Sequence, residues 1–181
     1  FDSWARILKS VEDSVLIIYA NNEVSKANLT KEIIKRGVEA NRLVLGKSIP
    51  KSQYLARYRT ADLFLDTHPY NAGTTASDAL KMGLPMITYL GKSYQARMGA
   101  SIVNALNLPE LITNTPEEYE FLAIELATNP EKLKAIREKL TNNLETAPLY
   151  DTKLFTQNLE SAYTQMYERY QTGLKPDHIY V

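Results

Sequence analysis

Short apolar runs alternate with helical patterns along most of the chain, and this alternation limits the fold more than any other feature. Four runs indicate strands, at 14–20, 42–46, 62–67 and 85–90. Helical patterns lie around and between them, at 2–12, 26–36, 51–60, 74–83 and 93–107. The run 14–20 (SVLIIYA) is typical of a strand buried on both faces. Strands separated by helices in this way indicate βαβ units and a parallel sheet.

The pattern changes near Thr115, after which only helices are predicted. Thr115 before Pro116 and Asn129 before Pro130 are typical helix starts. A last helix is expected over 152–171, with Tyr163, Tyr167 and Tyr170 as packing residues. No strand pattern follows the fourth run. We therefore divide the chain into a Rossmann-like core, 1–112, and a C-terminal helical segment, 113–181, that packs on the same domain; 147–149 is the candidate hinge.

Composition excludes several classes of protein. The chain has 181 residues, 21 Lys and Arg, 21 Asp and Glu, and no Cys. A zero net charge argues against nucleic acid as the main partner, because binding a phosphate backbone needs a basic surplus. The absence of Cys excludes thiol catalysis and Cys-based zinc sites. The absence of Cys also fits a cytoplasmic protein, which we expect here. No apolar run is long enough to span a bilayer. The chain opens at Phe1 within a helical pattern, which suggests a fragment of a longer protein.

The segment 62–90 carries the clearest functional signal. A predicted strand leads through a loop of small residues directly into a helix that begins near Thr74 and Thr75. Free N–H groups and the helix dipole at such a corner form an anion site suited to a diphosphate. Asp78 follows one turn later, where a carboxylate can accept hydrogen bonds from ribose hydroxyls. Ligands of open α/β sheets bind at this carboxyl edge of the strands.

Spacing alone leaves a second interpretation open, since Gly and Thr at a strand-to-helix turn are also ordinary capping residues. The segment is neither a P-loop nor a G-x-G-x-x-G motif. His68 is expected to be a loop residue near the corner. Asp62 and Asp66 stand at an even spacing on a predicted strand, which should point them the same way. Nothing in the sequence sets their separation as a hydrolase pair requires.

The run LDTHPYNAGTTASDALKMGLPMITYLG (65–91) resembles the donor-binding half of the O-GlcNAc transferase family, glycosyltransferase family 41, which includes SPINDLY-type proteins. The resemblance continues through ARMGAS (96–101), LPELI (108–112), APLYDTKLF (147–155) and YERYQTGLKPDH (167–178), and so covers nearly the whole chain. It implies a GT-B glycosyltransferase, in which two Rossmann-like domains face a cleft. This chain would be most of the second domain. The parent protein would usually carry tetratricopeptide repeats upstream.

The resemblance also assigns binding residues. It implies that the diphosphate and ribose bind near the start of the helix 74–83, at Asn71, Gly73, Thr74, Thr75 and Asp78. The nucleobase falls to the segment before the third strand, at Ile49, Pro50, Lys51, Tyr54 and Arg57. Two positions depart from the animal enzymes, which have His where this chain has Gly73 and Tyr54. A Tyr can still offer a π face to a base, whereas Gly73 leaves only backbone N–H groups for the phosphates.

The implied reaction is transfer of a sugar, GlcNAc from UDP-GlcNAc, to Ser or Thr hydroxyls of an acceptor protein. It would be inverting and independent of metal, because a helix N-terminus can stabilise the leaving diphosphate and no Asp-x-Asp motif is present. No cofactor is expected. The family's catalytically important Lys lies upstream of this segment, so catalytic residues are expected mainly outside the chain, and the isolated chain should bind nucleotide weakly without turnover.

Several alternatives stay open at this point. The donor can be GDP-fucose, as in the SPINDLY branch, or the protein can be a nucleotide-sugar epimerase of the same build. A non-catalytic nucleotide-binding module is a further possibility, because Gly73 and Tyr54 both depart from the family pattern. A receiver-like domain is poorly supported, because residues 19–22 (YANN) offer no acidic cluster after the first strand.

Overall fold

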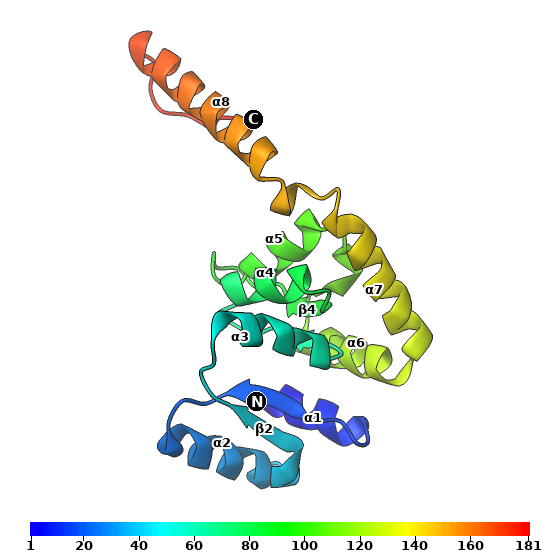
Figure 1. Ribbon diagram of the computed structural model, residues 1–181. Coiled ribbons are helices and arrows are strands. Elements are labelled where there is room, and N and C mark those ends of the chain that lie inside the picture. Colours follow the sequence, from blue (N-terminus) through cyan, green and yellow to red (C-terminus); the bar gives the residue numbers. More distant parts are fainter.

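The computed structural model describes residues 1–181 as an α/β molecule with two parallel sheets (Figure 1). The first sheet pairs β1 (Leu16–Tyr19) with β2 (Leu43–Gly46). The second has the order β3-β4-β5, from β3 (Phe64–Leu65), β4 (Met86–Tyr89) and β5 (Ile112–Thr113). All the pairings are parallel, so the predicted α/β fold with parallel strands is confirmed.

Eight α-helices and four short 3₁₀ helices connect and follow the strands. The α-helices are α1 (Asp2–Ser10), α2 (Glu23–Lys35), α3 (Lys51–Arg57), α4 (Thr74–Lys81), α5 (Met98–Ala105), α6 (Pro116–Thr128), α7 (Pro130–Leu144) and α8 (Thr152–Gln171). The 3₁₀ helices are η1 (Ala40–Arg42), η2 (Tyr58–Thr60), η3 (Pro109–Leu111) and η4 (Pro148–Tyr150). The predicted N-caps are confirmed, since Thr115 accepts from the Glu118 amide and Asn129 from the Lys132 amide.

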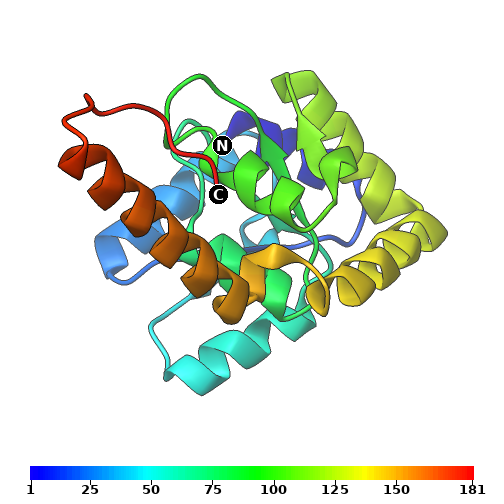
Figure 2. The ribbon, with the colours of Figure 1, turned by 90° about the horizontal axis from the view of Figure 1, so that it is seen from above.

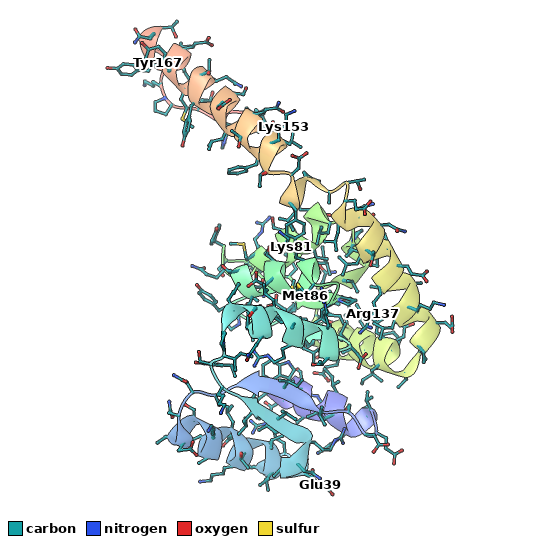
Figure 3. All side chains as sticks on the ribbon, viewed as in Figure 1. Glu39, Lys81, Met86, Arg137, Lys153 and Tyr167 are labelled. Atoms are coloured by element: carbon teal, nitrogen blue, oxygen red, sulfur yellow. The ribbon has the colours of Figure 1, made fainter.

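The main hydrophobic core surrounds β4. Met86, Ile87 and Thr88 are fully buried, and helices α4, α5 and α6 all contact this strand. Figure 1 shows β4 between α4 and α5 on one side and α6 on the other. In Figure 3, Met86 lies within this layer. A smaller core joins α1 and α2 to the β1–β2 sheet through residues that include Leu8, Ile33 and Leu43. The molecule therefore has two hydrophobic centres.

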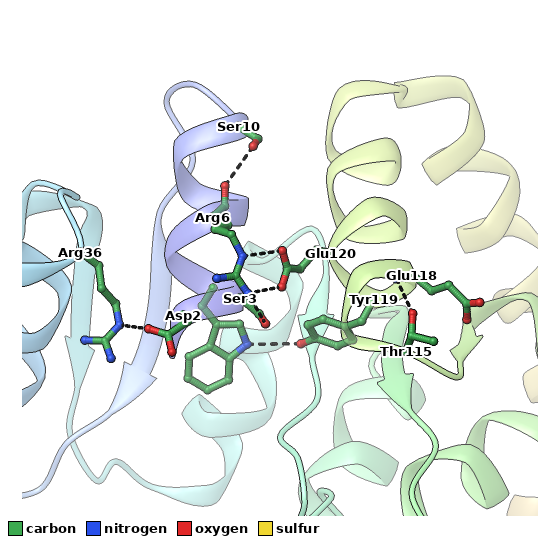
Figure 4. A network of polar contacts seen from close by, with 10 residues as sticks. Asp2, Ser3, Arg6, Ser10, Arg36, Thr115, Glu118, Tyr119 and Glu120 are labelled. Carbon is green, nitrogen blue, oxygen red and sulfur yellow. Dashed lines mark hydrogen bonds and ion pairs between the residues drawn. The ribbon is translucent and has the colours of Figure 1, made fainter.

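Helices α1 and α6 connect the two centres through polar side chains (Figure 4). The indole N–H of Trp4 donates to the Tyr119 hydroxyl at 3.3 Å. Arg6 donates to both carboxylate oxygens of Glu120, at 2.6 and 2.7 Å. This hydrogen bond lowers the pKa of Glu120. The smaller α/β unit is thus attached to the larger one at a defined position.

Several predicted elements need correction. The structure has a fifth strand, β5, because two residues suffice to pair with Thr88 and Tyr89 of β4 but are too few to form a recognisable apolar run. The predicted boundary between the core, 1–112, and the C-terminal segment, 113–181, falls within β5. The division into these two parts stays a prediction. The helix expected over 93–107 begins only at Met98, because the preceding turn is closed by the Gly91 amide donating to the Ala96 carbonyl at 2.8 Å.

The last helix, α8, spans the predicted residues but does not pack as expected. Figures 1 and 2 show it extending from η4, with the C-terminal tail turning back along it. Arg169 holds that tail by donating to the Lys175 carbonyl at 2.6 Å. No residue of α8 is buried. Tyr163, Tyr167 and Tyr170 are all exposed, so their predicted packing role is wrong in this structure; Figure 3 shows Tyr167 pointing away from the helix.

Candidate functional site

The predicted anion site lies where β3 ends and α4 begins. Gly73 is the N-cap of α4 and provides no side-chain cap. The first amides of a helix have no acceptor within it, so those of the exposed Thr74 and Thr75 are available to a ligand. The side chains of Thr74 and Thr75 are exposed. The corner is therefore open and has N–H and hydroxyl donors together, which is the arrangement that a diphosphate needs.

Asp78 brings the two predicted parts of the site together. Its carboxylate accepts a hydrogen bond from the Lys51 ammonium at 2.6 Å, across 27 positions of sequence. The Lys51 side chain is largely exposed and Asp78 is mostly covered. Helix α3 therefore lies beside the first turns of α4, and the residues expected at the base and at the ribose form one continuous surface.

Tyr54 is the centre of the base-side residues. The Lys51 ammonium lies 4.9 Å and the Arg57 guanidinium 5.6 Å from the centroid of its ring. Its hydroxyl shares a hydrogen bond of 2.5 Å with Tyr58, whose pKa is raised mainly by burial. Each cation is attracted by the electron-rich face of the ring. Tyr54 is half-buried and lies next to the pair formed by Lys51 and Asp78.

Pro50 and Ile49 precede α3 as predicted. The carbonyl of Pro50 accepts the Tyr54 amide at 2.9 Å, so it is already used by the helix, and Ile49 is half-buried. Gly46 at the end of β2 was missed by sequence analysis. A Cβ at this position would stand 2.9 Å from Arg57 Nη1, so a glycine here leaves room for the guanidinium. The only sequence signal for this role of Gly46 was a single Gly at the end of a predicted strand.

Asn71 is placed inside the loop, where little of it is accessible to a ligand. It is 3% exposed. Its side-chain amide donates to the Thr67 carbonyl at 2.7 Å, and its side-chain oxygen accepts the Gly99 amide at 3.3 Å. The geometry supports a role in shaping the loop before α4. Direct contact with phosphates, which the resemblance implied, receives no support from this position.

Asp62 and Asp66 differ in surroundings, and β3 is shorter than predicted and includes neither residue. Asp62 is exposed and pairs with Arg137 of α7 at 3.1 Å. Asp66 is 3% exposed, and burial raises its pKa although hydrogen bonds from Ala72, Thr88 and Thr67 act in the opposite direction. The two carboxylates therefore do not share one environment and do not form a pair.

The neighbouring loop after β4 supports the corner. The Asn71 amide donates to the Gln95 carbonyl at 3.0 Å, and the exposed His68 ring lies against Tyr89 with 4.2 Å between the centroids. Surface hollows of about 530 and 380 Å³ occur elsewhere, beside α1 and α2 and on α7, with mostly polar linings. No three His, Asp or Glu side chains gather as metal ligands would. None of the helices combines the length and apolar character needed to cross a membrane.

Comparisons with known proteins agree on one family. The model of glycosyl transferase family 41 matches residues 1–159. A UDP-N-acetylglucosamine–peptide N-acetylglucosaminyltransferase of Caenorhabditis elegans is 32% identical over 98% of this chain and 16% of its own length. A probable enzyme of the same name, SPINDLY of Hordeum vulgare, is 32% identical over 96% of this chain and 19% of its own length.

Among solved structures, a mutant of the O-GlcNAc transferase of Thermobaculum terrenum matches with a TM-score of 0.89 and 34% identity. That match covers 95% of this chain and 34% of the other. The chain thus spans less than a fifth of these curated relatives and about a third of the solved enzyme.

Proposed function

Because the chain belongs to glycosyl transferase family 41, we propose that it forms the donor-binding part of a protein O-glycosyltransferase. The donor is a nucleotide sugar, UDP-GlcNAc, and the acceptor is a Ser or Thr hydroxyl of a protein. The observation that carries the proposal is the uncapped start of α4 beside the pair formed by Lys51 and Asp78. Similarity to a UDP-N-acetylglucosamine–peptide N-acetylglucosaminyltransferase supports it.

The chemistry follows from the leaving group. Breaking the bond between the anomeric carbon and the diphosphate leaves negative charge on the phosphates. The amides at the start of α4, its dipole and the hydroxyls of Thr74 and Thr75 can stabilise that charge as it develops. The proposal therefore includes inverting transfer that requires no metal. The catalytic residues, including any general base, are expected mainly outside this chain.

The rest of the nucleotide occupies the surface between α4 and α3. Asp78 accepts the ribose hydroxyls, and Lys51 is the cation that stands nearest to it. Tyr54 offers a ring face to the base, held by Lys51 and Arg57. An aromatic face stacks on either uracil or guanine, so a GDP-linked sugar is the second candidate donor. Upstream tetratricopeptide repeats stay a prediction from the resemblance, and a cytoplasmic location stays a prediction from the absence of Cys.

Calorimetric titration of UDP and GDP into the chain tests the proposal. We expect UDP to bind, with equal affinity when EDTA is present. Asp78→Ala should weaken binding by about 1–3 kcal/mol, since a polar group of the ligand loses its partner. Asp62→Ala is the matched control, because it removes an exposed carboxylate that pairs with Arg137 away from the corner. Tighter binding of GDP than of UDP would assign a GDP-linked sugar as the donor. Absence of binding of either nucleotide would contradict the proposal.

A further inference from the structure

Asp66 lies at the carboxyl end of β3 and is the most enclosed charged group near the proposed site. Its Oδ1 accepts two backbone amides, those of Thr67 and Ala72, both at 2.8 Å. Its Oδ2 accepts the Thr88 hydroxyl of β4 at 2.7 Å. The carboxylate thus faces three donors and no cation within hydrogen-bonding distance. A carboxylate can accept all three hydrogen bonds.

The two amides that share Oδ1 lie at opposite ends of the loop that leads into α4. Thr67 begins this loop, and Ala72 stands two residues before Thr74. Holding both amides on one oxygen fixes the distance between the loop's ends. Asn71 adds a second closure by donating to the Thr67 carbonyl at 2.7 Å. The position of the first turn of α4 relative to β3 therefore depends on the Asp66 side chain.

The surroundings leave Asp66 little freedom to move. A Cβ at Gly99 of α5 would collide with Oδ2 of Asp66 and with the Thr88 hydroxyl, so α5 approaches the carboxylate closely. On the other side, the Tyr119 hydroxyl donates to the Asp66 carbonyl at 3.0 Å. Tyr119 in turn accepts from Trp4, as Figure 4 shows. The side chain of Asp66 is thus enclosed by β4 and α5, and its main-chain carbonyl is bonded to α6.

We propose that Asp66 is a positioning residue for donor binding, which holds the loop 67–73 so that the α4 amides, Thr74 and Thr75 meet the diphosphate. The inference rests on the proposed function and adds a residue that does not itself contact the ligand. The carboxylate acts through the Ala72 amide on the start of α4. A neutral amide at this position can keep the loop in place, because one side-chain oxygen can accept both backbone amides while the Thr88 hydroxyl turns to accept.

The test compares four forms of the chain: wild type, Asp66→Ala, Asp66→Asn and Thr113→Val. Thr113 is the matched control, because its buried hydroxyl donates to the Thr88 carbonyl at 3.0 Å and does not contact the loop. Amide hydrogen exchange reports the order of the loop 67–73, and calorimetry reports UDP affinity. Urea unfolding reports the stability of each form.

We expect Asp66→Ala to lose exchange protection in the loop and to bind UDP at least about tenfold more weakly. Asp66→Asn should restore affinity to within about threefold of wild type. Thr113→Val should lower stability while leaving UDP affinity unchanged. If Asp66→Ala does not fold, Asp66→Ser replaces it, because a Ser hydroxyl is too short to reach both amides.

Two results would overturn the inference while the proposed function stands: unchanged UDP affinity in Asp66→Ala, or an equal loss of affinity in Thr113→Val. Failure of Asp66→Asn to restore binding would also overturn it, since the charge and not the loop geometry would then matter. If the wild-type chain binds neither UDP nor GDP, the proposed function is wrong and this inference is wrong with it.

Discussion

The two parallel sheets of the molecule come from similar apolar runs but differ in how they are covered. In the β3-β4-β5 sheet, the central strand has helices around it, and Ile87 is fully buried. In the β1–β2 sheet, Leu16 and Ile18 pack against the smaller core, whereas Ile17 is 40% and Tyr19 is 55% exposed. The prediction that 14–20 is buried on both faces is therefore wrong here. The proposed diphosphate corner therefore follows a strand of the sheet that is packed on both sides, whereas the proposed base-side residues on α3 follow β2 of the sheet with one exposed face.

The largest expected difference between the sheets is in stability. Ile87→Ala should lower the free energy of unfolding by about 3–4 kcal/mol, because it leaves a cavity in a closely packed core. Ile17→Ala removes the same atoms from a partly exposed position and should cost about 1 kcal/mol or less. Urea unfolding of both variants measures the contrast. Equal losses would show that the exposed face of β1 is covered in solution.

The same contrast explains what could be predicted from sequence. The start of α4 at Thr74 could be predicted from local residues, because small residues at a strand-to-helix turn favour a helix start, but the N-cap is Gly73 and no Thr side chain caps the helix. The contact between Lys51 and Asp78 depends on how α3 packs, and no local pattern encodes a pair 27 positions apart. The role of Asp66 was missed because alternation along a strand was applied to 62–67, of which only Phe64 and Leu65 form β3.

A smaller expected effect is in the pH dependence of stability, to which Asp66 and Glu120 contribute with opposite signs. Burial raises the pKa of Asp66, so its contribution to stability is full below the unfolded pKa of about 4 and is lost as the pH rises through the native value. The Arg6 hydrogen bond lowers the pKa of Glu120, between the two units. The contribution of Glu120 to stability is below about 1 kcal/mol, because Arg6 is largely exposed. This contribution is present above the unfolded pKa of Glu120 and is lost as the pH falls through its native pKa.

Urea unfolding from about pH 3 to pH 7 checks both signs. The stability of wild type relative to Asp66→Asn should decrease as the pH rises. Its stability relative to Glu120→Gln should increase over the same range. If both differences change in the same direction, the buried carboxylate is better solvated than its 3% exposure implies, and the contrast between the packed sheet and its attachment is weaker than the structure indicates.

The smallest expected effect concerns the corner itself, at Gly73. A Cβ there would meet only Met98 Cγ at 3.9 Å, and no positive φ requires a glycine. Because the packed sheet holds the loop, Gly73→His should leave the fold intact and add a donor beside the diphosphate. We expect UDP affinity to rise by about threefold, below 1 kcal/mol. Gly73→Ala is the control, since it adds the Cβ without the donor. An equal gain in both variants would assign the effect to a stiffer loop, and a loss in Gly73→His alone would place the phosphates elsewhere.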